Sequence, residues 1–367
     1  MTVYIVGLGL HPPSRAERGL RLEEMAWRTS RAALESAGVS RRQLDSVTLG
    51  ACDEMDGRPI SSMLMTAPAG GYGTDEIKVT DSGATALALA YARVLAGESN
   101  LGLVVSWCKT SKTDIGSVFR LRGEPFYTRP LGIDDTVADA LFAQAVAAEF
   151  DVSDGEANQR VLDAYTRAAR NPRGIGHDVP TRDAVAASAY EATPLRAAQR
   201  APHTDGAVAL ALASEQFLRS NPGVKPLARI AGIGWATDEY RLDGQRLRAM
   251  KSARTAWQRA LKQAGLRGAG ELDAVELESQ TAWHEAAYVR AFGIERKETV
   301  SPSGGAFAQN PLFCTGLVNA AEAVLQVSGR AGAVQRPGVK RAAAHGCHGY
   351  AQQGNVVMVF EGTGATQ

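Results

Sequence analysis

The alternation of apolar and polar positions predicts a strand–turn–helix unit between Glu76 and Gly97. Ile77 and Val79 alternate with polar neighbours, which is the period of a half-buried strand. A turn over residues 80–83 follows, and apolar residues then recur at helical spacing as far as Gly97. Such a turn places a side chain at the tip of a strand and directs the backbone N–H groups of the helix N-terminus toward a ligand bound next to that tip. The unit therefore predicts a position suited to a nucleophile.

The same patterns predict further elements on both sides of this unit. Between about residues 110 and 200 the periodicity weakens, and we expect loops and helices there. The prolines at 222 and 226 suggest a boundary, which divides the chain into halves 1–225 and 226–367. The expected strands are 3–9, 44–50, 101–107, 205–214 and 273–277, and the expected helices are 22–37, 83–96, 138–150 and 156–170.

The second half repeats two segments of the first half in the same order. Residues 230–235 (IAGIGW) resemble residues 5–10 (IVGLGL), and residues 259–277 resemble residues 31–49. Each member of the longer pair has a helix ending in Ala-Gly, a short basic loop and then Leu-Asp before a strand. Two matches in one order predict a duplicated α/β unit, with halves related by a pseudo-dyad. Since ligands bind at the carboxyl ends of strands, we expect a cleft between the halves.

Composition narrows the possible functions. The 367 residues are 45% hydrophobic, which is enough for a large core, and the formal net charge of +1 indicates neither a nucleic-acid partner nor a membrane surface. No apolar run approaches the roughly 20 residues that span a bilayer, and the N-terminus enters a strand pattern without a leader. The four cysteines are widely spaced, and the six histidines lack ligand spacing except for His345 and His348, which no paired carboxylates accompany. We therefore expect reduced thiols, no metal and a cytoplasmic location.

Five segments, spread over nearly the whole chain, match motifs of one known family. They are residues 83–87 (GATAL), 105–112 (VSWCKTSK), 203–209 (HTDGAVA), 274–293, and 301–305 (SPSGG) with 310–316 (NPLFCTG). In their order and spacing these segments resemble the thiolase superfamily. The resemblance is nearest to the sterol-carrier-protein-type thiolases and their thiolase-like relatives, and it implies a five-layered αβαβα fold. The tail, residues 349–359, also resembles the thiolase-like subunit of bacterial phloroglucinol acyltransferases.

The resemblance implies a nucleophilic cysteine at the strand–helix turn, where this chain has Thr80. A threonine hydroxyl without an adjacent base is a far poorer nucleophile than a thiolate. Ser82 lies two residues further on and is either the N-cap of the helix or an acyl-accepting serine. The implied Gly-His-Pro motif reads Gln-Asn-Pro here, so Asn310 replaces its histidine. The Asn310 amide can donate to an oxyanion in the pocket but cannot serve as a base.

Two further positions bear on acid–base chemistry. Glu278 follows the strand 273–277, where the family has asparagine or histidine. A carboxyl in a partly apolar pocket has a raised pKa and could act as general acid or base, although a polar residue at a strand end is an equal alternative. His284 and the residue after it open the next helix. His284 could reach the same cleft or lie on the surface.

The loop near residue 347 carries the most reactive group. Cys347-His348-Gly349 fits the Cys-x-Gly motif in which, by the resemblance, a cysteine moves protons at the substrate α-carbon. Cys347 is either that reactive group, with His348 beside it, or a buried inert thiol, because the tail match places a leucine at this position. Tyr350 could donate a hydrogen bond, and Gly305 and Gly349 are expected at the pocket or oxyanion site.

Three functions fit these observations. The first is an enzyme that makes or breaks C–C bonds, or transfers acyl groups, on acyl-CoA or acyl-carrier-protein thioesters without the usual cysteine. The second is a non-catalytic partner subunit of a heteromeric acyltransferase or aldolase. The third is an acyltransferase that uses Ser82 or Cys347 covalently. The resemblance also implies a homodimer through strand 76–80, a possible OB-fold or second thiolase-like partner, and no cofactor besides the coenzyme A thioester itself. Region 112–200 would supply the acyl side of the pocket.

Overall fold

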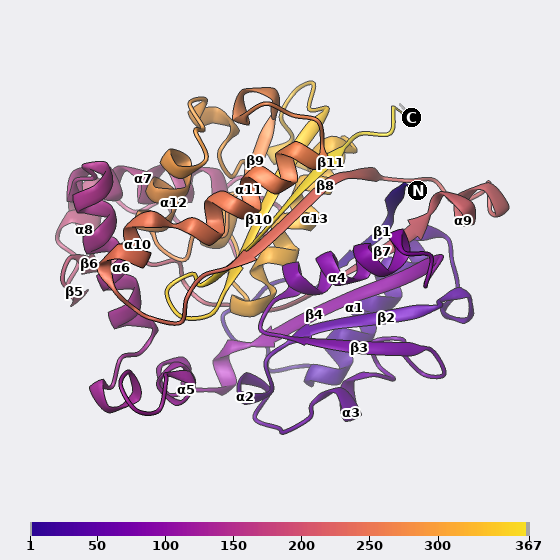
Figure 1. Cartoon of the computed structure of the whole chain (residues 1–367), viewed down its shortest axis with the longest axis horizontal. Coiled ribbons are helices and arrows are strands. Elements are labelled where there is room, and N and C mark those ends of the chain that lie inside the picture. Colours follow the sequence, from indigo (N-terminus) through magenta and orange to yellow (C-terminus); the bar gives the residue numbers. More distant parts are fainter. Residues whose placement is uncertain (1, 365–367) are drawn as a thin grey trace.

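The computed structural model describes residues 2–364 and shows a mixed α/β fold (Figure 1). One nine-stranded sheet has the order β3-β2-β4-β7-β1-β8-β11-β10-β9, and β5 and β6 form a separate small hairpin. The strands are β1 (Val3–Leu10), β2 (Ser46–Ala51), β3 (Asp75–Thr80), β4 (Leu101–Lys109), β5 (Tyr190–Ala192), β6 (Leu195–Arg196), β7 (Asp205–Ser214), β8 (Ala228–Thr237), β9 (Ala274–Glu276), β10 (Arg341–His348) and β11 (Gly354–Glu361).

Helices cover both faces of the sheet and form an additional group to one side of it (Figure 1). They are α1 (Leu22–Ala37), α2 (Asp53–Asp56), α3 (Ser62–Met65), α4 (Gly83–Leu95), α5 (Ile115–Arg122), α6 (Asp135–Phe150), α7 (Asp154–Ala168), α8 (Arg182–Ala186), α9 (Glu215–Ser220), α10 (Gly244–Ala249), α11 (Lys251–Gln263), α12 (Ala282–Ala291) and α13 (Thr315–Val327). Within residues 2–364, no helix is long and apolar enough to cross a membrane.

The sheet has an internal symmetry that starts where β1 meets β8. This junction is short, with Tyr4 opposite Arg229 and Ile5 opposite Ala228. From it, one side runs β1-β7-β4-β2-β3 and the other runs β8-β11-β10-β9. Beyond β9, where a fifth strand would lie, Val300 forms an isolated parallel bridge to Val275. The two sides therefore share one strand order, as expected for a duplicated unit.

The repeated glycines explain the matching sequences IVGLGL and IAGIGW. In the first half, a Cβ on Gly7 would lie 2.2 Å from the Ala33 carbonyl oxygen of α1. In the second half, a Cβ on Gly232 would lie 2.3 Å from the Ala260 carbonyl oxygen of α11. Only glycine allows a helix backbone to approach a strand this closely. The repeat thus encodes the same strand–helix contact twice, between β1 and α1 and between β8 and α11.

Between the two sides of the sheet, α4 and α13 pack against each other through small residues. A Cβ on Gly316 would lie 2.8 Å from the Ala84 Cβ, and a Cβ on Gly83 would lie 2.8 Å from the Leu317 Cβ. Both helices therefore begin at a point where their backbones nearly touch. They belong to one buried apolar cluster that also includes residues of β1, β8 and β11. The central layer places two helix N-termini side by side.

The predicted α/β fold is confirmed, and most element positions are close to those expected. Strand 205–214 coincides with β7, whereas the helix expected at 138–150 starts three residues earlier, at Asp135. The extension follows from Asp134, whose carboxylate accepts a hydrogen bond from the Val137 backbone N–H and caps the helix. Region 110–200 contains α5, α6, α7 and α8 with the small hairpin. The division into halves at residue 225 stays a prediction.

Candidate active site

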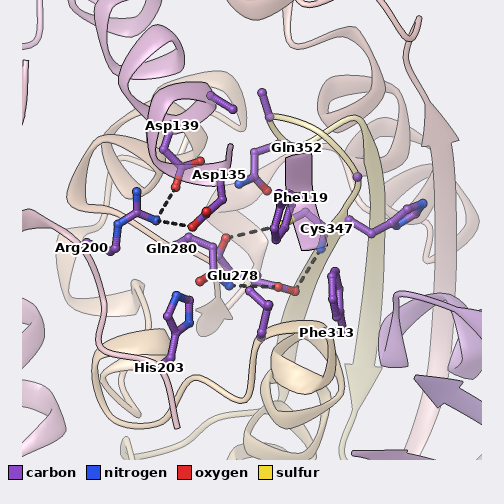
Figure 2. Close-up of a pocket in the computed structure, with 15 residues that line it drawn as sticks. Phe119, Asp135, Asp139, Arg200, His203, Glu278, Gln280, Phe313, Cys347 and Gln352 are labelled. Atoms are coloured by element: carbon purple, nitrogen blue, oxygen red, sulfur yellow. Dashed lines mark hydrogen bonds and ion pairs between the residues drawn. The ribbon is translucent and has the colours of Figure 1, made fainter. Parts of the chain in front are cut away.

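A cavity of about 40 Å³ lies where the loops after β9 and β10 meet α5 and α6. It has room for more than one water, which needs roughly 10–15 Å³. One wall is apolar and includes Phe119, Leu312 and Phe313. The other wall is polar, and its side chains converge from four separate parts of the chain (Figure 2). The polar residues are Asp135, Asp139, Arg200, His203, Glu278, Gln280, Cys347, His348 and Gln352.

Glu278 is the most deeply buried carboxyl of this cavity, with 3% of its surface exposed against 6% for Asp139. Its Oε2 accepts a hydrogen bond from the Cys347 backbone N–H at 3.0 Å, and its Oε1 accepts one from Gln280 Nε2 at 3.3 Å. Burial raises the pKa of Glu278 from 4.5 to about 8, and the bonds from Cys347 and Gln280 only partly oppose this rise. Close to neutral pH, the Glu278 carboxyl can therefore both release and accept a proton.

An amide network behind the cavity fixes the neighbours of Glu278. Asn310 Nδ2 donates to Gln280 Oε1 at 2.7 Å, and Asn310 Oδ1 accepts from Thr315 Oγ1 at 2.9 Å. Asn310 Nδ2 also lies 3.4 Å from His203 Nδ1. Asn310 is fully buried and does not itself line the cavity. It affects the cavity only through its hydrogen bonds to Gln280 and His203, which do line it.

His203 is neutral in this environment. Burial, together with the positive charge of Arg200, lowers the pKa of His203 from 6.5 to about 4. Because Asn310 Nδ2 can only donate, His203 Nδ1 acts as the acceptor and its proton resides on Nε2. The His203 ring, which lines the cavity, thus carries an N–H donor at Nε2.

Arg200 organises the acidic part of the wall. Its Nη1 lies 2.9 Å from Asp139 and 3.3 Å from Asp135, and its Nε lies 2.9 Å from Glu191. Burial raises the pKa of Asp135 and of Asp139 from 3.8 to about 6, and Arg200 opposes the rise in both. With three carboxylates around it, Arg200 leaves no net positive charge for an anionic ligand. Figure 2 shows its two contacts on α6.

Cys347 lines the same cavity, and its thiol lies 3.8 Å from the Glu278 carbonyl oxygen. Burial, together with the negative charge of Glu278, raises the pKa of the Cys347 thiol well above its usual range. The thiol is therefore protonated at neutral pH and is a weak nucleophile. Cys347 lies near the end of β10 rather than in the expected loop, and its backbone N–H donates a hydrogen bond to Glu278.

Of the three residues after Cys347, two line the cavity and one, Tyr350, does not. His348 and Gly349 line the cavity, and Gly349 has a φ of +78°, which favours glycine. Tyr350 does not line it, because its hydroxyl donates to the Ile133 carbonyl and its ring packs edge-on against Phe119 at 6.0 Å. Tyr350 thus ties this loop to the segment after α5.

In the turn between β3 and α4, the motif match points to Thr80, but the buried residue is Asp81. Thr80 is exposed at the end of the edge strand β3. Asp81 is buried instead, with 8% exposed, and pairs with Arg122 of α5. Ser82 accepts a hydrogen bond from the Thr85 backbone N–H at 3.1 Å, so of its two interpretations the helix N-cap matches the observed contact.

Two other candidate residues lie outside the cavity wall. His284 is fully buried, stacks on Phe142 with centroids 4.5 Å apart, and bonds to Thr281 Oγ1 at 2.9 Å. Burial and Arg200 lower the pKa of His284 to about 3. Gly305 has a φ of +55° and its N–H donates to Ser303 Oγ at 3.1 Å, away from the cavity.

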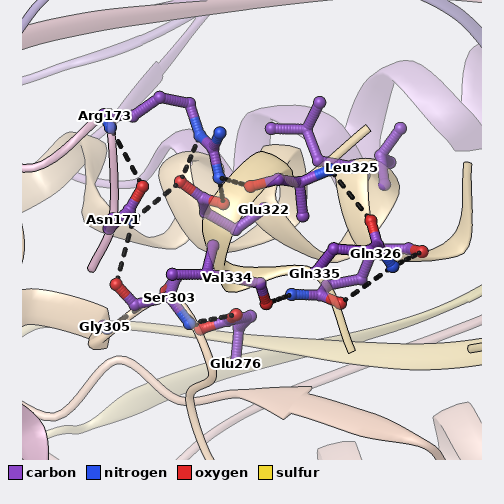
Figure 3. Close-up of polar contacts among 12 residues, drawn as sticks. Asn171, Arg173, Glu276, Ser303, Gly305, Glu322, Leu325, Gln326, Val334 and Gln335 are labelled. Atoms are coloured by element: carbon purple, nitrogen blue, oxygen red, sulfur yellow. Dashed lines mark hydrogen bonds and ion pairs between the residues drawn. The ribbon is translucent and has the colours of Figure 1, made fainter. Parts of the chain in front are cut away.

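Gly305 belongs to a second buried polar cluster, which Figure 3 shows. Glu276 accepts two hydrogen bonds from Ser303, at 3.1 Å from the backbone N–H and 2.6 Å from the hydroxyl. Arg173 binds both oxygens of the buried Glu322, at 2.8 and 2.5 Å. Burial and the negative charge of Glu322 raise the pKa of Glu276 to about 8. This cluster joins the segment after α7 to β9 and α13.

Sequence reasoning did not select Asp135, Asp139, Arg200, His203 or Gln280 as site residues. His203 and Gln280 stood inside the matched segments 203–209 and 274–293, so a signal existed for them. Arg200 and the two aspartates lie in the region of weak periodicity, where no pattern marks individual residues. That region does line one side of the cavity, through Phe119, α6 and Arg200, and its role as the acyl side of the pocket stays a prediction.

Comparison with solved structures identifies the fold. The chain is similar to human mitochondrial 3-ketoacyl-CoA thiolase, with 18% identity, a TM-score of 0.78 and 99% of each chain covered. It is also similar to the Ltp2-ChsH2(DUF35) aldolase, with 16% identity, a TM-score of 0.80, and coverage of 100% of this chain and 99% of that one. An acetyl-CoA acetyltransferase from Syntrophomonas wolfei matches with 18% identity, a TM-score of 0.78 and 98% of each chain. No family model and no curated protein matches. The chain thus has the fold of the thiolase superfamily.

Proposed function

We propose that this protein is a thiolase-like enzyme that makes or breaks a C–C bond next to the carbonyl of an acyl-CoA or acyl-carrier-protein thioester. One observation carries the proposal: the wall of the cavity includes both a buried carboxyl, Glu278, whose pKa is raised to about 8, and a neutral histidine, His203. A buried acid with a pKa near the working pH and a fixed hydrogen-bond donor are the groups that proton transfer beside a carbonyl requires.

In this mechanism Glu278 removes the proton from the carbon next to the thioester carbonyl. The electron pair of that C–H bond forms a C=C bond to the carbonyl carbon, and the π pair of the C=O bond moves onto the carbonyl oxygen, which accepts a hydrogen bond from His203 Nε2–H. A donor placed where charge develops stabilises the transition state more than the ground state. Asn310 is a positioning residue, because its amide sets the tautomer of His203 and holds Gln280 against Glu278.

No covalent acyl-enzyme is part of the mechanism. Thr80 is exposed on the edge strand and Ser82 caps α4. The Cys347 thiol has a raised pKa and is protonated. Bond formation or cleavage at the α-carbon proceeds through the enolate alone, so these departures from the thiolase motif are compatible with activity.

The proposed partners are a second copy of this chain and a small OB-fold or thiolase-like subunit. β3 is the outer strand of the sheet and pairs only with β2 among the described residues, which leaves its other edge free for a dimer contact. The aldolase neighbour is named as a complex of two proteins. A non-catalytic partner subunit is the second candidate function, and the small cavity of about 40 Å³ favours it.

Deuterium exchange tests the proposal. The protein is incubated in D2O with acetyl-CoA, propionyl-CoA and octanoyl-CoA, and the mass of each thioester is followed. We expect deuterium at the α-carbon with the wild type and an exchange rate at least about 100-fold lower with Glu278→Gln. Glu276→Gln is the matched control, because Glu276 is equally buried, has a similarly raised pKa and does not line the cavity. Absence of exchange by the wild type with all three thioesters would favour the non-catalytic subunit.

A further inference from the structure

The part of the cavity wall on α6 carries more negative charge than its arginine balances. Asp135 and Asp139 are four residues apart, which places them on the same face of this helix. Both line the cavity, and Arg200 Nη1 lies 3.3 Å from Asp135 Oδ2 and 2.9 Å from Asp139 Oδ2. Arg200 Nε also pairs with Glu191 at 2.9 Å. One guanidinium thus faces three carboxylates.

The second oxygen of Asp139 is left without a donor. Only 6% of Asp139 is exposed, and Arg200 bonds to its Oδ2, whereas Oδ1 lies 3.7 Å from His284 Nε2, too far for a hydrogen bond. His284 Nε2 accepts instead from Gln352 Nε2 at 3.1 Å. Figure 2 shows this oxygen of Asp139 pointing away from Arg200 and toward Gln352 on the cavity wall. A buried acceptor without a donor costs free energy, so Oδ1 favours a ligand that supplies a proton.

Aromatic rings form part of the other wall. Phe119 and Phe313 both line the cavity, and their rings stack with centroids 6.1 Å apart. The faces of aromatic rings attract cations. Arg200 is the only arginine or lysine among the described residues that line the cavity, and its carboxylate partners already neutralise it. A positive charge in the cavity would therefore meet carboxylates on one wall and aromatic rings on the other.

These features select the charge of the ligand. Burial raises the pKa of Asp135 and of Asp139 only to about 6, so both are mostly ionised at neutral pH and repel an anion. Within residues 2–364, no group of three or more His, Cys, Asp or Glu side chains is placed to hold a metal ion. A primary ammonium group supplies a positive charge and three N–H donors.

We propose that Asp135 and Asp139 form a subsite for an ammonium group on the acyl chain, so that the substrate is an amino-acyl thioester. Asp139 Oδ1 accepts one N–H of the ammonium group and the Asp135 carboxylate accepts another. The inference rests on the proposed function for the thioester and adds the class of its acyl group.

Calorimetry with three isosteric thioesters tests the subsite. 3-Aminopropionyl-CoA, 3-hydroxypropionyl-CoA and butyryl-CoA differ only in the end of the acyl chain, which is an ammonium, a hydroxyl or a methyl group. We expect the wild type to bind the amino probe about 10-fold more tightly than butyryl-CoA. Asp135→Asn and Asp139→Asn should each reduce this preference, and the double variant should abolish it. Asp134→Asn is the matched control, because Asp134 does not line the cavity and asparagine preserves its role as the N-cap of α6.

Equal binding of the amino and butyryl probes, tighter binding of the hydroxyl probe, or a preference that persists in the double variant overturns the proposal. If the double variant does not fold, the two single variants and the comparison of probes on the wild type still decide.

A second titration contains no thioester and separates the subsite from the proposed function. Butylammonium and 1-butanol are titrated into the same proteins and followed by NMR. If the wild type binds none of the three thioesters, the proposed function fails, yet tighter binding of butylammonium that is lost in the aspartate variants would support the subsite. Equal binding of butylammonium and 1-butanol in that case overturns the subsite as well.

Discussion

Replacing Glu278 with glutamine should change how the stability of the protein depends on pH. Glu278 has a pKa of about 8 in the folded protein and an ordinary value of 4.5. The unfolded chain therefore releases this proton at lower pH than the folded chain does, and wild-type stability falls as pH rises from about 4.5 to 8. Glutamine does not ionise, so the variant lacks this loss.

The size of the effect follows from the two pKa values. At about 1.4 kcal/mol for each pH unit, the shift from 4.5 to about 8 corresponds to at most about 5 kcal/mol. Below pH 4.5 the variant should be less stable than the wild type by about 1 kcal/mol, because the hydrogen bond from Gln280 to Glu278 Oε1 is lost. Above pH 8 the variant should be more stable by several kcal/mol.

Urea unfolding followed by circular dichroism at pH 4, 5, 6, 7, 8 and 9 measures this difference. The wild-type curve includes other buried carboxyls, such as Glu276 and Asp139, so the quantity of interest is the variant minus the wild type at each pH. We expect that difference to rise between pH 5 and 8. A difference that is constant across this range would show that Glu278 is ionised in the folded protein and would refute the raised pKa.

Three further substitutions test the structural account. In Gly316→Ala the added Cβ would lie 2.8 Å from Glu278 Oε2. The substitution should therefore destabilise the protein by about 1–3 kcal/mol, as measured by thermal unfolding, and lower the rate of α-carbon exchange. Arg173→Ala should cost about 3–5 kcal/mol in urea unfolding, because Glu322 is left as a buried unpaired charge. Ser82→Ala should cost about 0.5–2 kcal/mol through loss of the α4 cap yet retain exchange activity, as the thioester assay can verify.

Matched controls isolate the causes proposed for Gly316→Ala and Arg173→Ala. Gly223→Ala adds the same methyl group where nothing lies within 4 Å, and it should leave the unfolding temperature nearly unchanged. Arg31→Ala removes an arginine from an exposed pair with Glu35 and should cost less than about 0.5 kcal/mol. If Ser82→Ala abolished exchange while the protein stayed folded, the serine would be a reacting group rather than a cap.

The fold could be predicted because its signals are local and repeated. The Gly-x-Gly strands at residues 5–10 and 230–235 each mark a strand that a helix approaches closely, and Gly7 and Gly232 show the same contact. The alternating and helical periods then locate most elements to within a few residues. These patterns depend on backbone geometry, which a short stretch of sequence largely determines.

The site was harder to predict because it depends on which side chain turns inward. The motif match indicates Thr80 at the turn, but the positive φ of Asp81 buries the next residue instead. Asn310 occupies the expected segment, yet Gln280 and His203 stand between it and the cavity. Glu278 follows the buried strand β9 and lines the cavity, which agrees with one of the two interpretations that the sequence left open.

The central claim is that acyl-thioester chemistry occurs here without a covalent acyl-enzyme. Intact-protein mass spectrometry on samples quenched during deuterium exchange with acetyl-CoA tests it most directly. We predict a protein of unmodified mass while the thioester gains deuterium. A protein mass increased by one acetyl group, and restored by Cys347→Ala or Ser82→Ala, would contradict the claim.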